Sequence, residues 1–95
     1  MEPFSSEDKV IELANDNKYG LCAMVWSHDT GKVLRFASAL CAGTVWANDN
    51  YGMAPEPDHP WGGVKESGFG KEFGVCGLED YTNMKVIALD FKKPV

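Results

Sequence analysis

Glycines crowd into residues 60–77, and a glycine-rich loop is the first candidate for chemistry because its backbone N–H groups can cradle a phosphate. Gly68, Gly70 and Gly74 give the spacing G-x-G-x-x-x-G, one residue longer than the dinucleotide pattern. The Walker pattern also fails, because Lys71 is followed by Glu72 instead of Ser or Thr. We therefore expect these glycines to serve tight backbone turns.

The cysteines are the second candidate. Cys22, Cys41 and Cys76 are odd in number and widely spaced, with no C-x-x-C pair for zinc or redox chemistry. Cys22 falls in an apolar run and Cys41 on the apolar stripe of an expected helix, where a thiol packs as a small hydrophobe. Cys76 has no His or Lys beside it to favour a thiolate. We expect three reduced thiols without a nucleophilic role, and His28 and His59 lack the spacing of a local metal clamp.

Composition excludes several classes of partner. The 95 residues are 44% hydrophobic, which is typical of a packed globular protein, and carry a net charge of −5. Lys and Arg are scattered among the acidic residues, so the sequence has no basic stripe for nucleic acid. The longest apolar run, residues 21–26, is far shorter than the roughly 20 residues that a membrane helix needs. With no signal-peptide pattern at residues 1–9, we expect a cytoplasmic protein without membrane contact.

Five sequence blocks, taken in order, resemble the closing part of aldehyde dehydrogenases. They are ANDNKYGL (14–21), VW with a following Asp (25, 26 and 29), AGTVWAN (42–48), PWGGVKESGFGKE (60–72) and YTNMK (81–85). The blocks span nearly the whole chain. The resemblance therefore implies the C-terminal part of an NAD(P)-dependent aldehyde dehydrogenase, with the betaine-aldehyde-dehydrogenase-like subgroup as a candidate.

The resemblance implies an α/β fold. Residues 1–81 would supply the C-terminal portion of the catalytic domain, with a partial Rossmann-like parallel sheet, and residues 82–95 an oligomerisation strand and tail. NAD or NADP is the cofactor of the parent family. The Gly-Gln-Cys type turn of the family's nucleophile and its general-base Glu are not found in these residues. Whether the chain is an enzyme stays open, and alone we expect it to be inactive and to bind no cofactor.

The resemblance also assigns roles to four residues. Glu72 matches a Glu described as a charge-relay partner of an upstream Lys, although a carboxylate at the first turn of a helix also complements the helix dipole. Trp61 matches an aromatic wall of the aldehyde tunnel, where it could attract a quaternary ammonium, or it simply packs the loop. The backbone carbonyls of Lys65 and Gly68 match the border of a monovalent-cation site. The sequence of the loop 49–59 differs from that common in the family, so the identity of the aldehyde substrate stays open.

Periodicity and breaker residues predict the elements that must hold these residues. The expected order is a strand stub (2–4), a helix (about 6–16) capped by Ser5 or Ser6, a strand covered on both faces (21–26), a helix (33–41) ended by Gly43, a strand (44–48), a loop (49–63), a poor helix (72–81) and a strand (84–91). The strand, helix, strand order favours parallel pairing.

Two classes of function remain. The first is a part of an aldehyde dehydrogenase, with an aldehyde substrate only in the complete enzyme. The second is a non-catalytic interaction protein that joins a homo- or hetero-oligomer of a dehydrogenase through Met84 to Phe91. That segment is apolar on both sides, and such a terminal strand requires a partner on each.

Overall fold

The computed structural model describes residues 2–49 and 56–92. Its elements, in chain order, are α1 (Glu7–Asn15), β1 (Tyr19–Gly20), β2 (Cys22–Val25), α2 (Thr30–Ala39), β3 (Thr44–Ala47), β4 (Val64–Lys65) and α3 (Gly74–Glu79). Helices and strands alternate through the first half of the chain, which confirms the expected α/β class. Part of the expected loop 49–63 lies outside the described residues.

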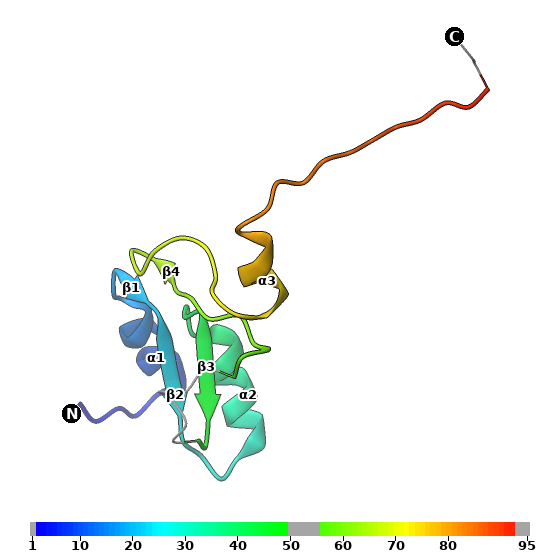
Figure 1. Ribbon diagram of the computed structural model, residues 1–95. Coiled ribbons are helices and arrows are strands. Elements are labelled where there is room, and N and C mark those ends of the chain that lie inside the picture. Colours follow the sequence, from blue (N-terminus) through cyan, green and yellow to red (C-terminus); the bar gives the residue numbers. More distant parts are fainter. Residues whose placement is uncertain (1, 50–55, 93–95) are drawn as a thin grey trace.

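The centre of the fold is the unit β2–α2–β3. The two strands pair in parallel, with Cys22 opposite Thr44 and Val25 opposite Ala47. Helix α2 connects them and packs on both, as Figure 1 shows. The strand, helix, strand prediction and its parallel pairing are therefore confirmed.

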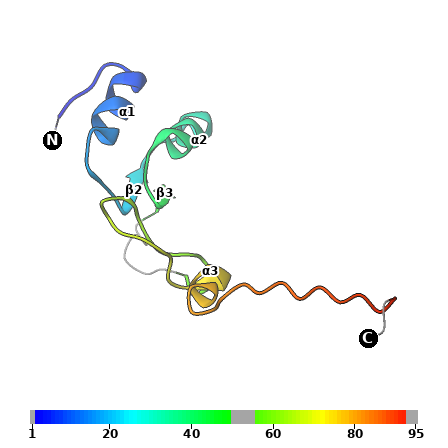
Figure 2. The same cartoon turned by 90° about the horizontal axis from the view of Figure 1, so that it is seen from above.

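Helix α1 begins where the sequence predicted. The Ser6 hydroxyl accepts a hydrogen bond from the Lys9 N–H at 3.5 Å, and Glu7 and Asp8 place negative charge in the first turn. Both features favour a helix start, because they satisfy free backbone N–H groups and complement the helix dipole. In Figure 2, α1 and α2 lie on the same side of the β2–β3 pair.

Charged and amide side chains connect the two helices. Glu7 accepts hydrogen bonds from the Arg35 guanidinium, the shortest at 3.0 Å, and forms an ion pair with Lys32 at 3.3 Å. The Arg35 hydrogen bonds, followed by that from Lys32, hold the pKa of Glu7 below its usual value. At the other end, the Asn15 amide donates to the Ala39 carbonyl and accepts from the Cys41 N–H, both at 2.8 Å. The two helices are thus joined near both ends.

One strand and one helix end in the first half of the chain differ from the sequence prediction. Residues 2–4 form no strand. Helix α2 ends at Ala39 because Leu40 turns to an extended conformation, with φ −76° and ψ 127°, so Gly43 does not cap the helix. Gly43 instead permits close packing between two segments of backbone, since a Cβ there would lie 1.8 Å from the Gly62 carbonyl oxygen.

Few apolar side chains are covered. Val33 is the one buried apolar residue among those that the structure describes. Leu21, Met24 and Trp26 are exposed, and Trp26 retains 58% of its accessible surface. Cys22 and Cys41 are exposed as well. The expected strand covered on both faces and the expected core packing of these two thiols are therefore wrong for this chain by itself, because two strands and two helices on one side do not enclose a sheet.

The chain leaves an unusually large surface in contact with solvent. Its accessible surface is 8189 Å², whereas a self-contained monomer of this mass has about 5,400 Å². Its radius of gyration is 19.6 Å, against about 12 Å for a compact domain of this length. The difference reflects both the open sheet and an extended C-terminal segment.

The C-terminal segment does not form the predicted strand. Residues 83–90 have no strand or helix assignment, and Figures 1 and 2 show them running away from the other elements. Met84 is 98% exposed and Phe91 is 87% exposed. A strand needs a hydrogen-bonded neighbour, and no described part of the chain pairs with this segment. The strand prediction for Met84 to Phe91 is wrong for the isolated chain.

The close packing at Gly43 gives a stability prediction. Gly43→Ala forces a Cβ against the Gly62 carbonyl and should lower the free energy of unfolding by about 1–3 kcal/mol. Urea unfolding followed by circular dichroism measures the change. Gly31→Ala is the matched control, since its Cβ would meet only atoms of the Asp29 and Arg35 side chains. Equal stability of Gly43→Ala and the unsubstituted chain would show that the contact does not hold the two segments together.

Candidate functional site

The loop 60–72 is attached to the β2–α2–β3 unit through β1 and β4. These strands pair antiparallel, with Tyr19 opposite Lys65 and Gly20 opposite Val64. The Gly20 N–H donates to the Ser67 hydroxyl at 2.8 Å, and the Gly20 carbonyl accepts from the Gly43 N–H at 3.0 Å. Gly20 is buried between the two segments. Its backbone therefore links the parallel strand pair to the loop.

Trp61 and Glu72 lie opposite each other at the two ends of this loop. The Trp61 N–H donates to the Glu72 carbonyl at 2.8 Å, and the Glu72 N–H donates to the Trp61 carbonyl at 2.7 Å. This pair of bonds forms an isolated antiparallel bridge. The structure thus brings together two of the residues to which the sequence assigned roles.

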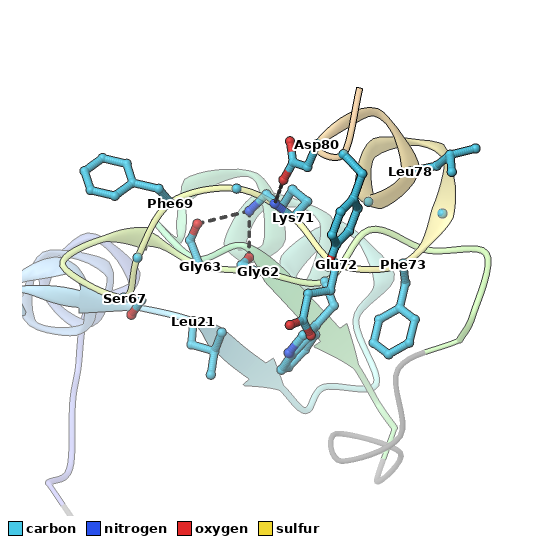
Figure 3. A pocket seen from close by; sticks show the side chains of 16 residues that line it. Leu21, Gly62, Gly63, Ser67, Phe69, Lys71, Glu72, Phe73, Leu78 and Asp80 are labelled. Carbon is cyan, nitrogen blue, oxygen red and sulfur yellow. Dashed lines mark hydrogen bonds between the residues drawn. The ribbon is translucent and has the colours of Figure 1, made fainter. Parts of the chain in front are cut away.

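A pocket of about 720 Å³ opens between the loop, α3 and Leu21. Figure 3 shows it from close by. Trp61, Gly68 and Glu72 line it, whereas Lys65 is not among the lining residues. Three of the four predicted site residues therefore share one cavity wall.

Trp61 also packs on a neighbour. Its ring centroid lies 5.5 Å from that of Trp46 on β3, with the ring planes tilted by 37°. This distance falls in the range of favourable aromatic pairs. The contact supports the interpretation that Trp61 packs the loop. Trp61 also lines the pocket, so its role in an aldehyde tunnel stays a prediction.

Glu72 is exposed and precedes helix α3. The helix begins at Gly74, after Phe73, whose φ of 61° places it in the left-handed region. Glu72 therefore lies before the first turn of α3. The prediction that its carboxylate complements the helix dipole from that turn is wrong. The helix begins later than predicted because both Phe73 and Gly74 adopt positive φ, which interrupts regular helical backbone.

Lys65 is the second residue of the short strand β4, and Gly68 follows that strand. Their φ angles of 55° and 122° lie in the left-handed region. The Lys65 ammonium donates to the carbonyls of Asn15 and Asn17, at 2.9 Å each, so its side chain stabilises the end of α1. The described residues contain no group of three or more His, Cys, Asp or Glu side chains that could hold a metal ion. A cation at this site would therefore depend on backbone carbonyls.

The glycines of the loop serve turns, as the sequence predicted. Gly68, Gly70 and Gly74 have φ angles of 122°, 76° and 58°. Gly68 and Gly70 lie between a two-residue antiparallel strand and a six-residue helix, and Gly74 is the first residue of that helix. A dinucleotide site instead needs a glycine turn between a parallel strand and the N-terminus of a helix. These residues do not fit the phosphates of NAD.

Sequence reasoning missed Lys71 and Asp80. The Lys71 ammonium donates to the carbonyls of Gly62 and Gly63, at 2.7 and 3.0 Å, while the Lys71 N–H donates to Asp80 Oδ2 at 3.0 Å (Figure 3). These partners are eight or nine residues apart, a separation that matches no helix or turn spacing. The sequence carries no local signal for them.

The aromatic pair can be tested by near-ultraviolet circular dichroism. Two indoles at this distance should couple and give a paired positive and negative signal. Trp46→Phe and Trp61→Phe should each abolish the same signal, because either substitution removes one member of the pair. Trp26→Phe is the control, since Trp26 is exposed. A signal that survives either of the first two substitutions would contradict the packing.

The described residues include no helix that is both long enough and apolar enough to span a membrane.

The chain is similar to enzymes that oxidise aldehydes. Betaine aldehyde dehydrogenase of Bacillus subtilis is 54% identical over 85 residues, which are 90% of this chain and 17% of that enzyme. The structure of Staphylococcus aureus betaine aldehyde dehydrogenase with NAD+ has 49% identity and a TM-score of 0.77, covering 84% of this chain and 15% of that one. A Bacillus cereus aldehyde dehydrogenase with NAD+ has 40% identity and a TM-score of 0.88, covering 95% and 18%.

This chain spans about a sixth of the length of the curated relatives that it matches. The model of the aldehyde dehydrogenase family matches residues 1–87. That match includes the parallel strand pair and the pocket-forming loop. The chain therefore belongs to the aldehyde dehydrogenase family.

Proposed function

We propose that this chain forms the C-terminal part of an aldehyde dehydrogenase that oxidises an aldehyde to a carboxylic acid with NAD or NADP. Residues 1–81 would belong to the catalytic domain and residues 82–95 would form an oligomerisation strand and tail. The observation that carries this proposal is that, among residues 2–49 and 56–92, Val33 is the one buried apolar side chain, in a fold similar to that of solved dehydrogenases. Such a segment needs further protein to cover its sheet.

Within that enzyme this chain would supply one wall of the aldehyde site. Trp61 lines the pocket and is held against Trp46, so its indole face is a rigid surface. An aromatic face attracts a quaternary ammonium with about 0.5–2 kcal/mol. We therefore place the enzyme in the betaine-aldehyde-dehydrogenase-like subgroup. The similarity to two betaine aldehyde dehydrogenases supports this choice.

Glu72 would act as the charge-relay carboxylate. It is exposed on the pocket wall, and its backbone is held by the bridge to Trp61. The carboxylate is thus available to a Lys from another part of the enzyme. The carbonyls of Lys65 and Gly68 would border a monovalent cation, because hard cations prefer oxygen ligands and both residues lie in a loop with left-handed backbone.

NAD or NADP would be held by other parts of the enzyme, since the glycine loop does not fit its phosphates. The cofactor accepts a hydride from the substrate in this class of reaction. This chain alone would have no dehydrogenase activity. We place the enzyme in the cytoplasm, because unpaired and dispersed cysteines suit a reducing compartment.

A chimera tests this proposal. The 95 residues replace the matching segment of Staphylococcus aureus betaine aldehyde dehydrogenase, and NADH formation is measured with betaine aldehyde. We expect the chimera to be active and the 95-residue chain to be inactive. Glu72→Gln in the chimera should lower kcat by about a hundredfold or more, whereas Glu79→Gln on α3 should change it little.

Two results would contradict the proposal. One is a folded chimera that binds NAD+ and has no activity. The other is turnover by the isolated chain that disappears when one of its cysteines is replaced. Loss of activity on Glu79→Gln equal to that on Glu72→Gln would remove only the relay role.

A second candidate function is a non-catalytic one, in which the chain joins a dehydrogenase oligomer by strand addition. The observation that favours it is the extended segment Met84 to Phe91, whose apolar side chains are exposed and whose backbone pairs with no described strand. An extended peptide can add to the edge of a sheet through main-chain hydrogen bonds.

Size-exclusion chromatography separates the two functions. The chain is mixed with full-length Bacillus subtilis betaine aldehyde dehydrogenase. Co-elution, abolished by replacing Val86 and Ile87 with proline, would favour strand addition, because proline removes backbone donors. The matched control places proline at Lys92 and at Phe4. Elution of the chain by itself, as a monomer or an aggregate, would exclude the second function.

A further inference from the structure

We propose that Lys71 is a positioning residue, which fixes the separation and orientation of Trp61 and Glu72. This inference rests on the proposed function in so far as those two residues form the pocket wall. Its physical basis is a set of contacts that join the two ends of the loop 60–72.

The Lys71 ammonium crosses from one side of the loop to the other. It donates hydrogen bonds to the carbonyls of Gly62 and Gly63, at 2.7 and 3.0 Å. Both bonds are partly buried, and a charged donor makes them stronger than bonds between neutral groups. An uncharged side chain at this position would leave both carbonyls without this donor.

These bonds lie directly beside the Trp61–Glu72 bridge. Gly62 follows Trp61 in the chain and Lys71 precedes Glu72. The ammonium contacts therefore join the same two segments as the backbone bonds of the bridge, one residue further along each segment. The stem of Lys71 fits closely, since a Cβ on Gly62 would lie 2.9 Å from Lys71 Cδ. The side chain therefore fixes how far apart the two segments lie.

The backbone of Lys71 has an anchor of its own. Its N–H donates to Asp80 Oδ2 at 3.0 Å, and Asp80 is the C-cap residue of α3. A Cβ on Gly70 would lie 2.7 Å from the same oxygen, so the loop passes close to the carboxylate. Figure 3 shows Lys71 between Gly62, Gly63 and Asp80. The helix, the loop and the bridge thus converge on one residue.

Hydrogen exchange of the chimera tests this role without any need for activity. Lys71→Met retains the apolar stem and removes the ammonium. We expect the Trp61 and Glu72 amides to exchange about tenfold faster, whereas the Asn48 amide, bonded to the Val25 carbonyl, should keep its rate. Lys9→Met is the matched control, because the Lys9 ammonium pairs with Glu12 on the exposed surface of α1, away from the loop. Unchanged rates at Trp61 and Glu72 would overturn the proposal.

Kinetics of the chimera test the consequence for catalysis. Lys71→Met should lower kcat/KM for the aldehyde about tenfold or more, with KM for NAD+ unchanged, and Lys71→Arg should restore most of the loss because a guanidinium can also donate to two carbonyls. If Lys71 acts through Trp61, its substitution should cost much less in a Trp61→Ala background. Strictly additive losses would overturn the positioning role.

The two experiments fail for different reasons. An inactive unsubstituted chimera refutes the proposed function, and hydrogen exchange then still decides the role of Lys71. An active chimera that does not respond to Lys71→Met, together with unchanged exchange rates, refutes the positioning role and leaves the proposed function intact.

Discussion

The candidate site depends on a close approach between backbone segments that only glycine permits. Gly43 follows α2, Gly20 precedes β2 and Gly62 lies in the loop, yet the atoms of these residues are nearly in contact. The Gly20 carbonyl accepts from the Gly43 N–H, and its N–H donates to Ser67. A side chain at Gly20 or Gly43 would separate the loop from the parallel strand pair, and one at Gly62 would separate the two ends of the loop. The pocket wall would then lose its support.

The second constraint is the surface that the chain does not cover. The sheet has two strands in its parallel part, both helices lie on one side, and the C-terminal segment is extended and apolar. The excess over a compact monomer is about 2,800 Å² on this chain alone, which is at least as large as the roughly 1,000–2,500 Å² that each partner of an obligate interface buries. Covering this surface by association with further protein would therefore stabilise the fold. A chain with an open pocket wall and an extended apolar C-terminal segment suits that description better than one that works alone.

Several sequence predictions failed for one reason. The expected strand at 84–91, the two-sided burial of residues 21–26 and the packing of Cys22 and Cys41 all assumed neighbours. An apolar run shows that a segment is suited to burial, but the burial itself needs atoms on both sides. Within the part of the chain that the structure describes, Val33 is the one apolar residue with enough neighbouring atoms to be buried. These segments are apolar, as predicted, but the described residues do not provide the neighbours that would bury them.

The sequence by itself determined part of the local structure of this protein, namely the start of α1 and the order of β2, α2 and β3. The Ser6 cap, the apolar spacing of α2 and the β-branched residues of β3 predict elements that form where expected, because caps and periodicity act over a few residues. The motif blocks likewise identified the family. Tertiary structure alone decided that Gly43 permits a contact instead of ending a helix, and that Lys71 joins Gly62, Gly63 and Asp80. Such interactions depend on where the chain returns in space, which local patterns do not encode.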